Sequence, residues 1–170
     1  MEDRDADYAA FFAASWPRLF RTTYAIAGDR QRTEDALQTA FAQAWASWPK
    51  VAAANDRIAY VRRMAVNAAL SRHRRASSRR ETVVAVLPET VQPSGEDALL
   101  SGDETWQAVQ GLPPRQRAVV VLRYYEDLSE REIADVLGCR PGTVKSQASA
   151  ALASLRSRLG DPATEERSNR

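Results

Sequence analysis

Six hydrogen-bonding side chains lie close together near the C-terminal end of the chain, and two of them are cations. They are Arg140, Thr143, Lys145, Ser146, Gln147 and Ser149. Arginine and lysine neutralise phosphates, while glutamine, serine and threonine form hydrogen bonds with base edges, so the set suits contact with DNA. Gln147 in particular can pair with adenine in a major groove. Arg140 stands where a helix cap prefers Ser, Thr, Asp or Asn, which favours a contact role for it.

The surrounding residues predict the two helices that would position these side chains. Ser129 and Glu132 form a capping box, and Gly138 favours the left-handed conformation that ends a helix. Pro141 suits the first position of the helix that follows. Apolar residues then recur with a helical period. We therefore expect a helix, a short turn and a second helix over residues 128–159.

A unit of this kind places the exposed face of its second helix in a DNA major groove. The alternative is an ordinary helical hairpin whose outer face is only solvated. Because the capping box, the glycine and the proline agree in register, we favour the DNA-binding interpretation. The pattern does not predict which DNA sequence is bound.

The charges of the chain are segregated, although its formal net charge is only +2. Residues 51–80 hold eight arginines and one aspartate, whereas residues 81–105 hold six acids and no base. Arginines bind phosphates without regard to sequence, and aromatic and amide groups can hold an unstacked base. We predict such a surface for a separated DNA strand, with a solvated basic face as the alternative. Its residues are Asn55, Tyr60, Arg62, Arg63, Asn67 and Arg74.

Apolar spacing predicts an all-α fold, with no credible pair of strands. N-terminal helical patterns cover residues 6–27, 34–48 and 56–75, with a loop at 50–55. Pro17 interrupts the first of these patterns, and Thr33 is a plausible cap for the second. Further helical patterns begin near residue 103 and after residues 112–114.

The chain divides into two small helical domains joined by an acidic linker. Two prolines and a glycine between residues 87 and 95 mark the linker. We expect an N-terminal domain at residues 1–78, the linker at 79–102, a helix-turn-helix domain at 103–160 and a disordered tail at 161–170.

Composition narrows the possible functions. Hydrophobic residues make up 44% of the chain and charged residues 27%, as in folded soluble proteins. There is no apolar run long enough to insert into a membrane and no secretory signal pattern, and the single cysteine, Cys139, fits a reducing cytoplasm. His73, the one histidine, lies among arginines. No metal-ligand spacing, phosphate loop or catalytic triad is present, so we expect no enzyme, metal or cofactor.

With these motifs placed, residues 8–159 resemble a bacterial sigma factor of the extracytoplasmic-function type. The resemblance is carried by motifs that follow one another in the family's order, at residues 34–45, 59–67, 112–117, 132–134 and 142–146. It implies that the first motif binds core RNA polymerase, the second recognises the −10 element and the remaining ones recognise the −35 element. The chain departs from many members at Gln147 and Ala150, where arginine is common.

The resemblance also implies roles for particular residues. The polymerase-binding residues would be Glu34, Asp35, Gln38, Phe41 and Trp45. For Trp45, simple core packing is the alternative, whereas Trp48 is assigned to the core. The loop with Lys50 and Asn55 would capture a flipped promoter base. The implied partners are core RNA polymerase and promoter DNA in the cytoplasm, and the family allows for an anti-sigma factor.

Other functions explain less of the sequence. A helix-turn-helix activator or repressor that is not a polymerase subunit accounts for the C-terminal motif alone. A helical adaptor with a basic face would ignore promoter sequence. In the family, the acidic linker passes near the active centre of the polymerase, while a plain flexible tether is the alternative.

Overall fold

The computed structural model describes residues 2–80 and 104–160, and beyond Ser71 it describes only two side chains of the first range, Arg74 and Arg75. Regular structure in these ranges is entirely helical, which confirms the predicted fold class. The elements are α1 (Glu2–Ala27), α2 (Arg30–Ala46), α3 (Trp48–Ala52), α4 (Arg57–Arg80), α6 (Glu104–Gln110), α7 (Pro114–Val120), the π-helical segment η1 (Val121–Tyr125), α8 (Glu130–Leu137) and α9 (Pro141–Leu159). The predicted tail and nearly all of the predicted linker lie outside the described residues.

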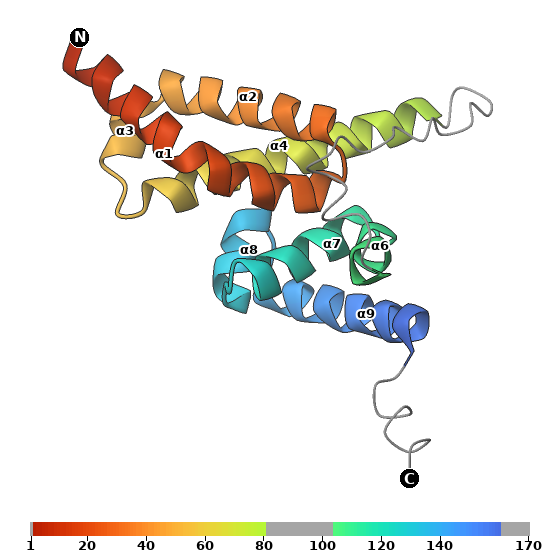
Figure 1. Cartoon of the computed structure of the whole chain (residues 1–170). Coiled ribbons are helices and arrows are strands. Elements are labelled where there is room, and N and C mark those ends of the chain that lie inside the picture. The colour runs from red at the N-terminus through yellow and green to blue at the C-terminus, as the bar shows by residue number, and fades with distance from the viewer. Residues whose placement is uncertain (1, 81–103, 161–170) are drawn as a thin grey trace.

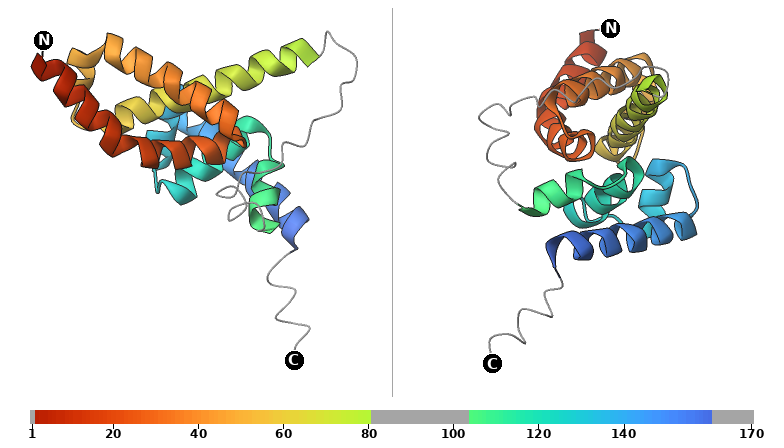
Figure 2. Two further views of the ribbon diagram at one scale, coloured as in Figure 1. Left: turned by 45° about the horizontal axis from the view of Figure 1, so that its top comes forward. Right: turned by 90° about the vertical axis from the view of Figure 1, so that its right-hand side faces the viewer.

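The helices are stacked in layers (Figures 1 and 2). α1, α2 and α4 form the first layer, and α6, α7 and α8 pack beneath it. α9 lies farthest from the N-terminal helices, on the other side of α7 and α8. The N-terminal helices are therefore in direct contact with the C-terminal ones, chiefly where α4 meets α8 and α7 and where α1 meets η1 and α7.

An aromatic and aliphatic core holds the N-terminal helices together. Leu19 of α1, Leu37 and Phe41 of α2, Trp48 of α3 and Val61 of α4 are all buried in it. The assignment of Trp48 to the core is confirmed, since only 3% of this residue is exposed. The core fixes which side of α4 faces inward.

A second apolar core joins the two sets of helices. Ile26 of α1 and Val66 of α4 are buried in the same cluster as Val119, Ile133 and Val136 of the C-terminal helices. Burial of apolar surface is the main favourable contribution to such contacts. The contact between the two sets of helices is therefore partly hydrophobic.

The boundaries of the N-terminal helices differ from the sequence predictions. Asp29 caps α2, since its carboxylate accepts the Arg32 N–H at 2.8 Å, and the predicted cap Thr33 is buried inside the first turn. Gly28, at φ +85°, ends α1 before it. α1 continues through Pro17, which is exposed. Half of the predicted loop at 50–55 belongs to the short helix α3.

Candidate nucleic-acid interface

The predicted helix-turn-helix is α8, a turn and α9. The Glu132 carboxylate accepts the Ser129 N–H at 2.8 Å, and the Ser129 hydroxyl accepts the Glu132 N–H at 3.3 Å, which completes the capping box. Gly138 adopts the left-handed conformation, with φ +62°, at the end of α8. Pro141 then opens α9. The capping box and the glycine stop are therefore confirmed as local structure.

One side of α9 is buried and the other is open to solvent. Val144, Ala148 and Ala151 are at most 4% exposed, and they fix the rotation of the helix against its neighbours. Of the six predicted DNA-binding residues, Arg140, Thr143, Lys145, Ser146 and Ser149 are exposed and Gln147 is half-buried. Arg140 occupies the N-cap without a side-chain capping bond, so its guanidinium is not used for capping.

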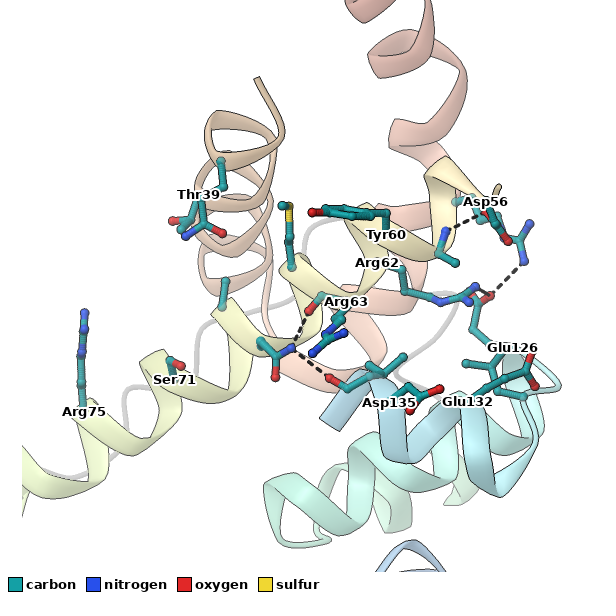
Figure 3. A pocket seen from close by; sticks show the side chains of 18 residues that line it. Thr39, Asp56, Tyr60, Arg62, Arg63, Ser71, Arg75, Glu126, Glu132 and Asp135 are labelled. Carbon is teal, nitrogen blue, oxygen red and sulfur yellow. Dashed lines mark hydrogen bonds and ion pairs between the residues drawn. The ribbon is translucent and has the colours of Figure 1, made fainter. Parts of the chain in front are cut away.

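A groove of about 1020 Å³ runs between α4 and α8 (Figure 3). Tyr60, Arg62, Arg63 and Asn67, all predicted to bind a separated strand, line its α4 side. Its opposite side is formed largely by residues of the C-terminal helices, namely Glu126, Leu128, Glu132, Asp135 and Val136. We call this feature the α4–α8 groove. Lys50, Asn55 and Arg74 are exposed elsewhere and do not line it.

Arg62 is not available to phosphates in this arrangement. It is only 6% exposed, and its Nη1 donates to Glu126 Oε2 at 2.9 Å. The same carboxylate accepts from Arg18 Nη2 at 3.0 Å and from the hydroxyl of Thr22. Burial on its own would raise the pKa of Glu126, but the hydrogen bonds from Thr22 and Arg18 and the charges of Arg62 and Arg18 bring that pKa below its ordinary value.

Asn67 is also engaged by the C-terminal helices. Its Nδ2 donates to the carbonyl oxygen of Val136 in α8 at 2.9 Å and to that of Arg63 at 2.8 Å. Arg63 is exposed, and Tyr60 is half-buried. The predicted strand-binding residues therefore share one face of α4, but two of the four in the groove are bonded to the C-terminal helices.

The predicted polymerase-binding residues lie on α2 and differ in exposure. Gln38 is exposed, while Glu34 and Asp35 are half-buried. Glu34 pairs with Arg30 at 2.8 Å, and Asp35 accepts from Gln31 at 3.1 Å. Both carboxylates therefore lie at the surface, and each interacts with a side chain of α2 itself.

The two aromatic residues of this set are not equivalent. Phe41 is 3% exposed and packs with Phe12 at 4.6 Å between ring centroids, so it supports the surface from within and cannot contact a partner directly. Trp45 is 38% exposed and lies beside Tyr8 at 5.0 Å, with the Arg4 guanidinium 4.4 Å from its ring. Trp45 thus packs against neighbouring residues and also exposes part of its ring. Neither core packing alone nor a free surface position describes it fully.

A second polar junction joins α1 to the C-terminal helices. Arg117 is 9% exposed and donates to the carbonyl oxygen of Ile26 at 3.0 Å. Gln110 donates to the carbonyl oxygen of Ala25 at 2.9 Å. These bonds satisfy carbonyls at the end of α1 that no helical N–H reaches. Tyr24 stacks on Trp106 beside them, with ring centroids 5.6 Å apart.

Sequence reasoning missed Glu126, Arg18 and Thr22 as members of this site. The arginines of residues 51–80 predicted a basic surface, but nothing in the local pattern shows which acid would face them. The partners Arg62 and Glu126 are separated by 64 positions in the chain. A contact of this kind is set by tertiary packing.

Residues 2–80 and 104–160 contain no group of three or more His, Cys, Asp or Glu side chains that could hold a metal ion. No helix among them is long and apolar enough to cross a membrane.

Comparison with known families finds two matches. The family Sigma-70 region 2 matches residues 11–79, and the family Sigma-70, region 4 matches residues 103–155. The first match includes α4 except for its last residue, and the second includes α8 and the part of α9 up to residue 155. Most of each candidate DNA-binding helix therefore lies within a matched region.

Individual proteins agree with these matches. The RNA polymerase sigma-E factor of Streptomyces antibioticus is 35% identical over 141 residues, which cover 83% of this chain and 78% of the relative. The ECF RNA polymerase sigma factor SigW of Bacillus subtilis is 26% identical over 159 residues, or 85% of this chain and 84% of the relative.

A solved structure shares the fold. The sigma factor RpoE in complex with the anti-sigma factor NepR, from Bartonella quintana, aligns with a TM-score of 0.68 over 92% of this chain and 98% of its own. The two sequences are 22% identical, so this likeness supports the fold alone.

Proposed function

This chain belongs to the sigma-70 family of RNA polymerase sigma factors, with relatives of the extracytoplasmic-function type, and we propose that α9 and α4 are its two promoter-binding surfaces. As a sigma factor it directs transcription initiation, with core RNA polymerase and promoter DNA as partners. The alternative of a regulator outside the polymerase leaves the match over residues 11–79 unexplained.

The observation that carries the proposal for α9 is the rotation of this helix. Because Val144, Ala148 and Ala151 are buried, Thr143, Lys145 and Ser146 project from the opposite side. Recognition helices bind the major groove through such a face. We assign duplex −35 recognition to Arg140, Thr143, Lys145, Ser146, Gln147 and Ser149.

The α4 face supports a different task. Tyr60 offers a ring, Asn67 an amide and Arg63 a cation on a single groove-lining surface. Stacking on an aromatic ring is worth about 1–3 kcal/mol per base, and cations follow the backbone. We assign the opened −10 strand to this surface, and Lys50, Asn55 and Arg74 to its flanks.

The remaining assignments follow from these two. The N-terminal domain would be residues 1–78, and α2 would carry the polymerase contact through Glu34, Asp35, Gln38 and Trp45, with Phe41 beneath. The factor would work in the cytoplasm, where polymerase and DNA meet, without catalytic chemistry of its own. An anti-sigma factor would be a further partner, as it is for the Bartonella protein.

Binding of duplex promoter DNA tests the proposal for α9. Start sites would first be mapped by in vitro transcription on genomic templates, with core polymerase and the full-length chain. Duplexes from the mapped upstream elements would then be bound by holoenzyme carrying Lys145→Ala or Arg156→Ala. Both residues are exposed cations of α9, but Arg156 lies in its last turn.

Lys145→Ala should weaken duplex binding about tenfold and lower the slope of log affinity against log salt by about one, as loss of a phosphate contact does. Arg156→Ala should leave both quantities nearly unchanged. Equal effects of the two substitutions would mean that charge alone, and not the recognition face, governs binding.

A further inference from the structure

A short loop of residues 53–56 joins α3 to α4 and ends beside the α4–α8 groove, and we call it the α3–α4 loop. Asn55 of this loop is exposed, and the next residue, Asp56, lines the groove (Figure 3). Tyr60, which also lines the groove, follows one helical turn later. The Asn55 amide therefore lies next to the surface to which a separated strand is assigned.

Arg57 closes the base of the α3–α4 loop. Its Nε donates to the carbonyl oxygen of Ala52 at 3.2 Å, so one side chain joins the residue before the loop to the residue after it. Carbonyl groups at the end of a helix lack an intrahelical donor, and Ala52 is the last residue of α3. The bond therefore satisfies an end carbonyl of α3 and fixes the separation of the two ends of the loop.

The guanidinium of Arg57 is itself held by α1 and by the aromatic core. Its Nη1 donates to both carboxylate oxygens of Asp7 in α1, at 3.0 and 3.3 Å. Its Cζ lies 5.6 Å from the centroid of the Trp48 ring, within the range of a cation–π contact. Trp48 is buried and packs against Tyr8, with ring centroids 5.1 Å apart. Arg57 thus ties the loop to α1 and to a rigid part of the core.

The start of α4 does not explain an arginine at position 57. Arg57 is the first residue of this helix, where the helix dipole favours anions and disfavours cations. The cap is supplied by its neighbour, since the Asp56 carboxylate accepts the Ala59 N–H at 2.8 Å. A residue that departs from the local preference usually has a role elsewhere in the fold. Here that role lies in the contacts with Ala52 and Asp7.

The ion pair lies at the surface, so its main effect is on geometry. The side chains of Arg57 and Asp7 are 38% and 42% exposed, and ion pairs that are this accessible to water add little to the stability of a fold. Holding a loop in one conformation before it binds, however, reduces the entropy that is lost on binding. The contacts of Arg57 therefore favour ordered presentation of the α3–α4 loop.

We propose that Arg57 and Asp7 are positioning residues for promoter recognition, which hold the α3–α4 loop so that Asn55 contacts a base of the separated strand. An asparagine amide offers both donors and an acceptor, which suits the edge of an unstacked base. Arg57 stays bonded within the protein and acts through the loop. This inference rests on the proposed assignment of Asn55 to the flank of the strand-binding surface.

The test breaks the ion pair without removing a proposed DNA-binding group. Asp7→Ala removes the carboxylate, and alanine is well tolerated within a helix. Arg57→Lys keeps the positive charge but loses the planar fork that reaches Ala52 and Asp7 at once. Asp5→Ala is the matched control, because Asp5 is an exposed acid of the same helix. Each full-length variant would be assembled with core polymerase into holoenzyme.

The probes are fluorescein-labelled single-stranded oligonucleotides that carry the −10 element of a mapped promoter, either intact or with one base removed at each position in turn. Wild-type holoenzyme should bind about tenfold more weakly when the base that Asn55 contacts is missing. With Asp7→Ala or Arg57→Lys this loss should shrink to about threefold or less, because the loop no longer holds Asn55 against the base. With Asp5→Ala it should stay at about tenfold, as in the wild type.

Positioning, charge and folding predict different patterns for Asp7→Ala. A positioning role weakens binding of the intact probe alone, because the loop has no base to contact once that base is removed. A purely electrostatic role would strengthen binding of both probes, since an anion is removed from a protein that binds DNA. A purely structural role would weaken binding of both probes equally. Either of the last two results would overturn the inference.

Asn55→Ala separates this inference from the proposed function on which it rests. The contacted base is the one whose removal no longer weakens binding in the Asn55→Ala holoenzyme. If that position exists but Asp7→Ala and Arg57→Lys keep the full loss of affinity there, the positioning role is wrong and the assignment of Asn55 stands. If Asn55→Ala changes the loss at no position, the assignment of Asn55 is wrong, and the inference fails with it.

Discussion

The two proposed DNA-binding helices carry similar side chains but differ in how available those side chains are. On α9, Arg140, Thr143 and Lys145 are exposed. On α4, Arg62 is buried in an ion pair, and Asn67 is bonded to α8. Polar composition therefore does not by itself determine whether a surface is free to bind DNA. What packs against that surface decides it.

The difference follows from the layers of the fold. α9 is the outermost of the C-terminal helices, and it buries only the side that faces its own neighbours. α4 lies between α2 and the C-terminal helices, so Val61 and Val66 are buried on its apolar sides while its polar face meets α8. Part of the polar face of α4 is therefore covered as long as the two layers stay in contact.

The largest expected effect separates two neighbouring arginines of α4. Arg62→Ala removes a buried partner of Glu126 and should lower the free energy of unfolding by about 3 kcal/mol. Arg63→Ala, at an exposed position, should change it by less than about 0.5 kcal/mol. Urea unfolding of the free chain, followed by circular dichroism, measures both.

In the holoenzyme, the comparison predicts that Arg63 matters more than Arg62 for the rate of promoter opening. Arg63→Ala should slow promoter opening there, although it leaves the stability of the free chain nearly unchanged. If the two substitutions destabilise the free chain equally, the ion pair between Arg62 and Glu126 does not contribute to the free energy of unfolding. The proposed contrast between the two arginines would then be wrong.

A smaller effect is expected from the amide that bridges α4 and α8. Asn67→Ala removes the hydrogen bond to the Val136 carbonyl and should cost the free chain about 1 kcal/mol. Gln43→Ala is the matched control, since Gln43 is exposed, lines the same groove and belongs to α2. The midpoints of urea unfolding would distinguish the two variants. Identical midpoints would mean that the hydrogen bond between Asn67 and Val136 does not stabilise the free chain.

The smallest effect is a dependence on pH. Because the pKa of Glu126 is lowered below its ordinary value of 4.5 in the folded chain, its charge stabilises that state above pH 4.5, and this contribution is lost as the pH falls further. The wild type should therefore lose stability on acidification more steeply than Glu126→Gln. Parallel losses between pH 6 and the acid limit of folding would contradict the assignment.

Much of the C-terminal unit could be predicted from sequence because its determinants are local. Ser129 and Glu132 are three positions apart, and the conformation of Gly138 depends on its own backbone. The shared face of Tyr60, Arg63 and Asn67 likewise follows from helical spacing alone. Such features need no knowledge of the rest of the fold.

What could not be predicted depends on long-range packing or on competing local signals. Arg62 is expected in solvent as one arginine among many, and only its contact with Glu126 buries it. Asp29 outcompetes Thr33 as the cap of α2, because Gly28 ends α1 one residue earlier and leaves Asp29 at the extended position. The π-helical turn before Glu126 has no recognisable sequence signal.

The central claim is that the free sigma factor exposes the DNA-binding face of α9 and partly covers that of α4, and a distance measurement tests it most directly. Donor and acceptor dyes on cysteines introduced at Ala13 and Ser157, both exposed, would report the separation of α1 from α9 after Cys139→Ser. A single short separation is expected in the free chain, with a longer one in complex with core polymerase. The same distribution of distances in both would contradict the account.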